Sequence, residues 1–221
     1  MDVVYAIETS NAVDDNLLRY IKQYAAASLD YFTFNSVASH VGIASYGSTT
    51  KTPLTLSSGV SPQVARYSLN TLPRVGGKAD LLRMLNTVEE RIFKTHGRDN
   101  IKKLLLIFMK SDNLNQFSDA VKTKLSDMRS RGIQPSFILI NEKELDFTNT
   151  LYPVIGNFFV DIKNGNLLPT IYPDFERLVA NLVGKCLNSF SMFLSVFLHQ
   201  NSFKFLVRHY STDTMISRKS K

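Results

Sequence analysis

The chain has 221 residues, of which 44% are hydrophobic, and a formal net charge of +7. This is enough for one well-filled α/β core, and the single cysteine, Cys186, excludes an intrachain disulfide bond. The positive charge is concentrated towards the C-terminus, and no basic stripe is interleaved with aromatic residues, which argues against a nucleic-acid-binding protein.

Strand-like and helix-like segments alternate along the first 186 residues. Short apolar runs rich in β-branched residues predict buried strands, and a proline within 50–58 favours an edge strand there. Apolar residues at helical spacing, such as Leu17, Ile21, Tyr24 and Ala25, predict the helices between them. Arg131-Gly132 predicts a glycine cap at the end of one of these helices. The predicted strands are 3–7, 40–47, 50–58, 102–110, 136–140 and 158–162, and the predicted helices lie near 14–25, 61–72, 81–92, 117–131 and 175–183. This alternation favours a mostly parallel sheet.

Six short sequences lie at the predicted element ends: DVVYAIETSNAV (2–13), HVGIASYGS (40–48), LPRVGGKADLLRML (72–85), KKLLLIFMKSD (102–112), RSRGIQPSFILI (129–140) and DFERLVANLVGKC (174–186). In this order they resemble the von Willebrand factor type A domain, in the style of type VI collagen chains, especially alpha-4-like chains. The resemblance covers residues 1–186 and implies a doubly wound, Rossmann-like α/β fold whose mostly parallel central sheet is flanked by helices. Residues 187–221 lack a clean period and are expected to form an appended tail, irregular or partly helical.

Members of that family hold Mg²⁺ at the strand ends, in a metal-ion-dependent adhesion site built from oxygen ligands. The family's ligand positions fall on Glu8, Ser10, Ala12, Ala79 and Lys110. Two hydroxyl positions are therefore alanines and one carboxylate position is a lysine. We expect a degenerate site without a metal, in which the Lys110 ammonium replaces the ion and pairs with Glu8. Ordinary loop residues without such a pair, or a weak Mg²⁺ site that recruits Asp112, are the alternatives.

The resemblance implies a non-catalytic protein-interaction module of the adhesion or extracellular-matrix type, with no cofactor. Its partners would be matrix proteins or collagens. The candidate partner-binding residues are Glu8, Ser10, Lys78, Asp80, Lys110 and Asp112. An enzyme is not expected, because the GGKAD sequence at 76–80 fails the phosphate-loop pattern at Leu72 and Ala79, and no histidines have metal-ligand spacing.

The resemblance also implies a secreted or extracellular-matrix protein. The sequence shows neither a signal peptide nor an apolar run of bilayer length, so retention in the cytoplasm is the alternative. An intracellular scaffold and a residual Mg²⁺-dependent adhesion module are the competing functions. In collagen-type relatives the cysteine at the position of Cys186 often bonds to one before the first strand. Since that partner is missing here, we expect a fragment or a truncated, pseudogene-like product of a larger protein. The alternative is that Cys186 is a buried or helix-end thiol without a role.

Overall fold

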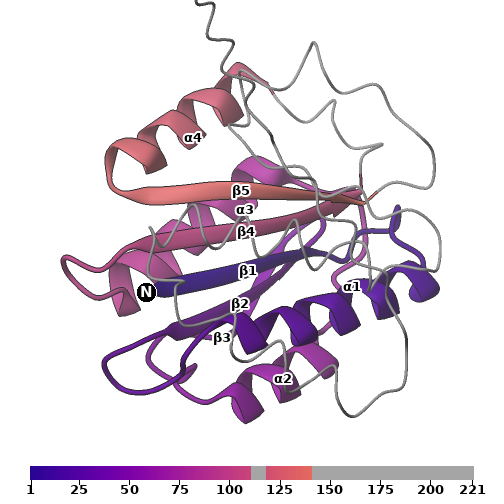
Figure 1. Cartoon of the computed structure of the whole chain (residues 1–221). Coiled ribbons are helices and arrows are strands. Elements are labelled where there is room, and N and C mark those ends of the chain that lie inside the picture. Colours follow the sequence, from indigo (N-terminus) through magenta and orange to yellow (C-terminus); the bar gives the residue numbers. More distant parts are fainter. Residues whose placement is uncertain (111–117, 141–221) are drawn as a thin grey trace, which may run out of the picture. The chain divides into compact units, whose positions relative to one another are not determined.

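The computed structural model describes residues 1–110 and 118–140 of the chain. In these residues five strands form one sheet, in the order β3-β2-β1-β4-β5 (Figure 1). The strands are β1 (Asp2–Glu8), β2 (His40–Tyr46), β3 (Thr50–Leu54), β4 (Lys103–Lys110) and β5 (Ile133–Ile140). β1 runs parallel to both of its neighbours, β2 and β4, and β5 runs parallel to β4. The predicted α/β fold with a mostly parallel sheet is confirmed.

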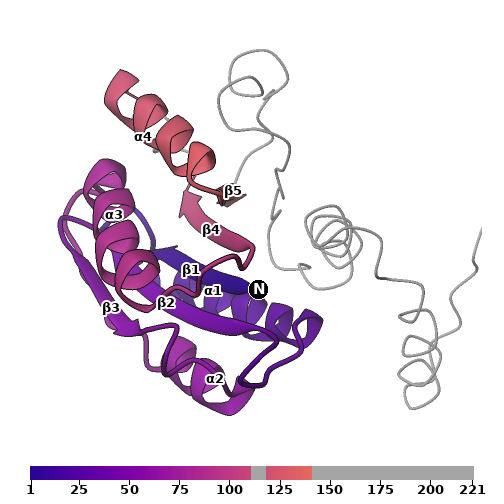
Figure 2. The same cartoon turned by 90° about the vertical axis from the view of Figure 1, so that its left-hand side faces the viewer.

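Helices cover both faces of this sheet. They are α1 (Asp15–Ser28), the 3₁₀ turn η1 (Leu29–Tyr31), α2 (Pro62–Asn70), α3 (Leu81–Val88), its π-helical continuation η2 (Glu89–Lys94) and α4 (Asp119–Ser130). Figure 2 shows α3 and α4 together on one side of the sheet. α3 and α4 share one hydrophobic cluster with alternate residues of β1 and β4, whereas Tyr24 of α1 packs edge-on against Phe108 of β4 on the other face. The arrangement is doubly wound.

The burial of the strands explains why some are continuous apolar runs and one contains a proline. All seven residues of β1 and of β2 are buried, because each strand has a neighbour on both sides and helices above and below. β3 is the antiparallel edge, as its proline predicted. It is short, exposes Lys51 and Pro53, and pairs with β2 through a register shift between Ile43 and Ser45. Each of these features discourages pairing with another chain's strand.

Side-chain caps fix where the helices begin. Asp14 accepts a hydrogen bond from the backbone N–H of Leu17, and Ser118 accepts one from Val121, so that each satisfies a donor that the first turn leaves open. Gly132 follows α4 with a φ of 77°, which confirms the predicted glycine cap.

Two details differ from the sequence-based expectation. The last described strand begins at Ile133 rather than at 136, because Ile133 already pairs in register with Lys103. In α1 the leucine on the buried face is Leu18, whereas Leu17, which the spacing predicted there, is only half-buried. Two adjacent leucines do not show which of them faces the core. The predicted strand at 158–162, the helix at 175–183, the boundary at 186 and the tail at 187–221 lie outside the described residues.

No helix in the part of the chain that the structure describes combines the length and hydrophobicity needed to cross a bilayer.

A buried ion pair closes the edge of the sheet opposite the strand C-termini. The Asp2 carboxylate is fully buried and receives hydrogen bonds from the backbone N–H and from Nε of Arg98, both at 2.8 Å. The same guanidinium donates to the carbonyls of Met1, Val37 and Ala38. Arg98 thus joins β1 to the loop that precedes β2.

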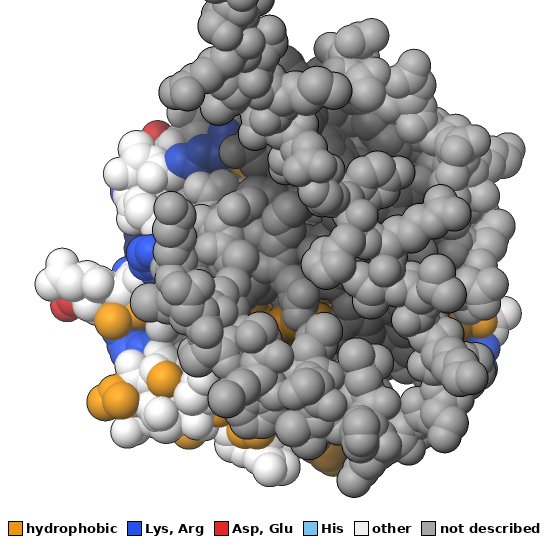
Figure 3. Space-filling model, in the orientation of Figure 1, with side chains coloured by type: hydrophobic (Ala, Val, Ile, Leu, Met, Phe, Trp, Pro, Cys, Tyr) orange, Lys and Arg blue, Asp and Glu red, His pale blue; other side chains and the backbone are white. Residues whose placement is uncertain are grey.

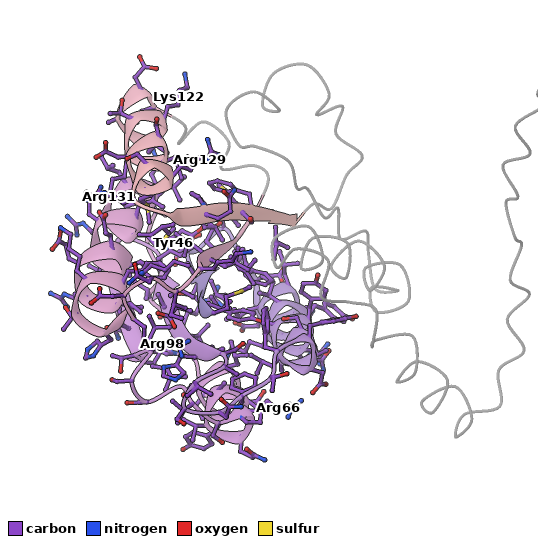
Figure 4. The ribbon with its side chains drawn as sticks, turned by 60° about the vertical axis from the view of Figure 1, so that its left-hand side comes forward. Tyr46, Arg66, Arg98, Lys122, Arg129 and Arg131 are labelled. Carbon is purple, nitrogen blue, oxygen red and sulfur yellow. The ribbon has the colours of Figure 1, made fainter. Side chains whose placement is uncertain are left out.

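We predict that Arg98→Met lowers the free energy of unfolding by about 3–5 kcal/mol, because it leaves the Asp2 carboxylate buried without its counter-charge. Arg66→Met is the matched control: Arg66 pairs with Asp30 in an exposed ion pair, and its loss should matter by less than about 1 kcal/mol. Figure 4 labels both arginines. Urea unfolding of the full chain measures the difference. Adding Asp2→Asn to Arg98→Met should recover part of the loss. Equal losses of stability for Arg98→Met and Arg66→Met would contradict this account.

Candidate functional site

Backbone hydrogen bonds join separate segments at the C-terminal edge of the sheet. They connect the end of β1, the turn after β2 and the loop that leads into α3. The four bonds run from Gly76 N to Thr9 O (2.9 Å), from Asn11 N to Gly77 O (2.9 Å), from Ser48 N to Gly76 O (3.0 Å) and from Asp80 N to Gly47 O (2.9 Å). We call this connected set the loop frame. In open α/β sheets, ligands bind at this edge.

The glycines of the loop frame are required by its geometry. Gly76 and Gly77 have φ values of 73° and 67°, a backbone conformation that residues with a Cβ atom rarely adopt. A Cβ on Gly47 would lie only 2.1 Å from the carbonyl oxygen of Gly76, so only hydrogen fits there. The Gly-Gly pair recognised in the sequence therefore holds the loop close against the turn after β2.

The Glu8 carboxylate lies inside this edge, and each of its oxygens accepts a hydrogen bond from a protein donor. Its Oε1 accepts a hydrogen bond from Ser10 Oγ at 2.5 Å, and its Oε2 accepts one from the backbone N–H of Lys110 at 2.8 Å. Glu8 is 0% exposed and Ser10 is 1% exposed. The Ser10 hydroxyl also accepts from the N–H of Ala12 at 3.2 Å. The carboxylate thus ties the end of β1 to the end of β4.

Tyr46 lies beside Glu8, since the two residues are in register across β1 and β2. Its hydroxyl donates to the Phe108 carbonyl at 3.2 Å, and Figure 4 shows it in the interior. Burial raises the pKa of Tyr46 well above its ordinary value, and the negative charge of Glu8 raises it further. The phenol therefore stays a neutral hydrogen-bond donor at physiological pH.

A surface cavity of about 530 Å³ adjoins the loop frame, between the starts of α3 and α4. Its described lining consists of Ser48, Lys78, Ala79, Asp80, Leu82, Ser118 and Val121. Asp80 caps α3 by accepting from the N–H of Arg83 at 2.9 Å, and its carboxylate also lies 3.5 Å from the Arg83 guanidinium. Lys78 is exposed.

The structure brings most of the sequence-predicted site residues to this edge, but in different environments. Glu8 and Ser10 are interior residues, so any part they take in partner binding would be to position the loops. Lys78, Ala79 and Asp80 all line the surface cavity, and Ala79 also packs into the hydrophobic cluster. Lys110 contacts Glu8 through its backbone, and pairing through its ammonium stays a prediction. Asp112 lies outside the described residues.

Sequence reasoning missed three polar residues of this edge. Thr9 Oγ1 donates to the Tyr46 carbonyl and accepts from the N–H of Val75, and Asn11 Oδ1 accepts from the N–H of Gly77. Tyr46 itself was the third. The signal was present for Thr9 and Asn11, which flank Ser10 in a polar run directly after a buried strand. Within the described residues, no three His, Cys, Asp or Glu side chains gather in a way that could hold a metal ion.

The fold and this edge define a class: a doubly wound α/β domain whose loops gather at the C-terminal edge of a mostly parallel sheet. The family model of the von Willebrand factor type A domain matches residues 2–173, and the chain belongs to this family. Domains of the family are generally non-catalytic modules that bind proteins, and they are often extracellular. No protein in the curated set compared with the sequence matches it significantly.

Solved structures share the fold at low sequence identity. Proximal thread matrix protein 1 from the mussel byssus superposes with a TM-score of 0.65 at 14% identity. Its structure has zinc in the metal-ion-dependent adhesion site (MIDAS) motif. That match covers 80% of this chain and 45% of the mussel protein, so the chain spans less than half of that length. Manganese-loaded TRAP from Plasmodium vivax gives a TM-score of 0.63 at 13% identity, covering 79% and 73% of the two chains. BatB from Bacteroides thetaiotaomicron gives 0.63 at 12%, covering 83% and 98%.

We predict that Glu8→Ala lowers the free energy of unfolding by roughly 2–5 kcal/mol, because the N–H of Lys110 and the Ser10 hydroxyl lose a buried acceptor. Glu8→Gln should lose less than about 1.5 kcal/mol, since its amide can accept from Lys110 N and donate to Ser10 Oγ. Urea unfolding followed by circular dichroism compares the two. Equal losses would mean that the hydrogen bonds of Glu8 are not what stabilises this edge.

Proposed function

We propose that the chain is a non-catalytic protein-interaction module of the adhesion type, and that it binds its partner through the C-terminal edge of the sheet without a metal ion. The observation that carries this proposal is the Glu8 carboxylate, whose two oxygens both accept hydrogen bonds from the protein. By the resemblance, Glu8 occupies the position of the family's first metal-site aspartate. The loop frame around it is intact and presents a surface cavity.

The residues at the ligand positions do not fit a divalent cation. Mg²⁺ requires hard oxygen ligands in near-octahedral geometry. Glu8 and Ser10 already use their oxygens within the protein, and Ala12 and Ala79 have no side-chain oxygen. A lysine replaces the later aspartate, and a unit positive charge at 4 Å repels another by about 4 kcal/mol at an effective dielectric constant of 20. Metal-dependent adhesion is therefore the weaker alternative.

Family membership and the surface chemistry support protein binding rather than catalysis. The edge offers an exposed lysine, hydroxyl groups and apolar side chains around one cavity, a mixture typical of interaction sites. One structural neighbour is described as a thread matrix protein. By the resemblance to type VI collagen chains, we propose matrix proteins or collagens as partners and the extracellular matrix as the location.

The loss of the metal site can be tested with cations. We expect the full chain to show no heat of binding and no rise in melting temperature with Mg²⁺ or Mn²⁺, whereas a bound ligand would stabilise it by RT ln(1 + [L]/Kd). The triple variant Ala12→Ser, Ala79→Thr and Lys110→Asp restores the missing ligand types and should gain both signals. A clear cation response of the unmodified chain would favour metal-dependent adhesion. No response of a folded triple variant would show that the ligand positions are misplaced.

Partner binding can be tested on immobilised collagens and other matrix proteins. We expect the full chain to bind at least one of them equally well in Mg²⁺ and in EDTA. Lys78→Glu should weaken this binding, because it reverses a charge on the proposed face. Lys51→Glu is the matched control, since Lys51 is also exposed but lies on the edge strand β3. Loss of binding in EDTA, or equal losses for both variants, would contradict a metal-free interaction through this edge.

A further inference from the structure

Resting on the proposed function, we propose that the cavity between α3 and α4 binds a carboxylate side chain of a protein partner next to an apolar one, with Lys78 as the counter-ion. The cavity has a volume of about 530 Å³, which is within the usual size range of binding pockets. It adjoins the loop frame at the C-terminal edge of the sheet, where open α/β sheets bind their ligands.

Lys78 differs from those basic side chains of the domain that are already paired with an acid. Figure 3 shows Lys and Arg side chains on the visible part of the described surface. Many of them form ion pairs: Arg66, Arg74, Arg83, Lys94, Lys122, Lys124 and Arg131. Within the described ranges, Lys78 is exposed and lines the cavity, and its ammonium makes no ion pair with any described acid. A positive charge there is available to a partner.

The described acids at the cavity do not cancel this positive charge. Asp80 is the acid in the lining, and its carboxylate is engaged by the backbone N–H and the guanidinium of Arg83. Asp119 follows the lining residue Ser118, and it pairs with Lys122. Because both carboxylates have a cation of their own, Lys78 provides the excess positive charge among the described residues of the cavity.

The walls of the cavity are held in place from two sides. Residues on both sides of Lys78 bond to other segments: Gly77 exchanges hydrogen bonds with Asn11, and Asp80 donates to the Gly47 carbonyl. Further along the two helices, the buried Glu89 of η2 forms ion pairs with Lys124 (2.5 Å) and Arg131 (2.7 Å), which tie the α3–η2 helix to α4. Figure 4 labels Arg131, and Figure 2 shows the two helices on the same side. The site therefore exists before a partner arrives.

The lining selects the kind of ligand. Ala79, Leu82 and Val121 provide apolar surface beside the ammonium, and Ser48 and Ser118 provide hydroxyl groups. In the described lining, one cation beside an apolar wall suits a single carboxylate flanked by an aliphatic side chain. A polyanion such as a sulfated glycan would need several cations, because its affinity depends on many charge contacts. We therefore assign the cavity to an acidic, apolar peptide segment.

The test is a titration of the ¹⁵N-labelled full chain with a capped five-residue peptide that carries one aspartate between two leucines. We expect saturable amide shifts at Gly77, Lys78, Leu82 and Val121, a much weaker response to the peptide with asparagine instead, and affinity that falls with salt. Lys78→Gln should weaken binding by about fivefold, Lys78→Arg should restore it, and Lys51→Gln should leave it unchanged. Unchanged amide spectra outside the cavity show that the variants are folded.

Two outcomes would overturn the inference: no saturable shift in the unmodified chain, or equal affinity in Lys78→Gln. A heparin disaccharide that binds more tightly than the peptide would overturn the assignment to a peptide. These results are separable from the proposed function. Metal-free binding to matrix proteins without any peptide response refutes the cavity but not the function. A peptide response without matrix binding supports the cavity and refutes matrix adhesion.

Discussion

The C-terminal edge of the sheet depends on one buried carboxylate. Glu8 ends the central strand β1 with no access to water, so its two oxygens must find donors inside the protein. They find a hydroxyl two residues later and a backbone N–H at the end of β4. One side chain thereby joins neighbouring strands at the place where the sheet stops and the loops begin. The loop frame is built on that junction.

Much of the fold could be predicted from the sequence, because hydrophobic periodicity reports burial directly. β4 is a continuous apolar run between lysines, and it became a strand buried on both faces. The proline at 53 correctly indicated an edge strand, and Gly132 correctly indicated a helix end. The failures have physical causes: the polar and proline-containing start of β5 hides its pairing with β4, and adjacent leucines in α1 blur the helical phase.

The site was harder to predict, because ligand positions follow from sequence order whereas hydrogen-bond partners do not. The sequence placed Glu8, Ser10 and Lys110 near one another, and the structure does the same. It could not reveal that Lys110 contributes its backbone N–H, since every residue has that group. Nor could it show that Ala79 packs into the core beside Lys78 on the surface, because both lie in one irregular loop.

The glycine-dependent contact between Gly47 and Gly76 has a consequence for the thermodynamics of recognition. Loops that become ordered only on association lose conformational entropy at that moment, which weakens the complex. Here the loop before α3 is already joined to two other segments by backbone hydrogen bonds, so its entropy is lost during folding. Association through the loop before α3 would then resemble the meeting of two rigid surfaces, with a rate set by diffusion and charge rather than by rearrangement of that loop.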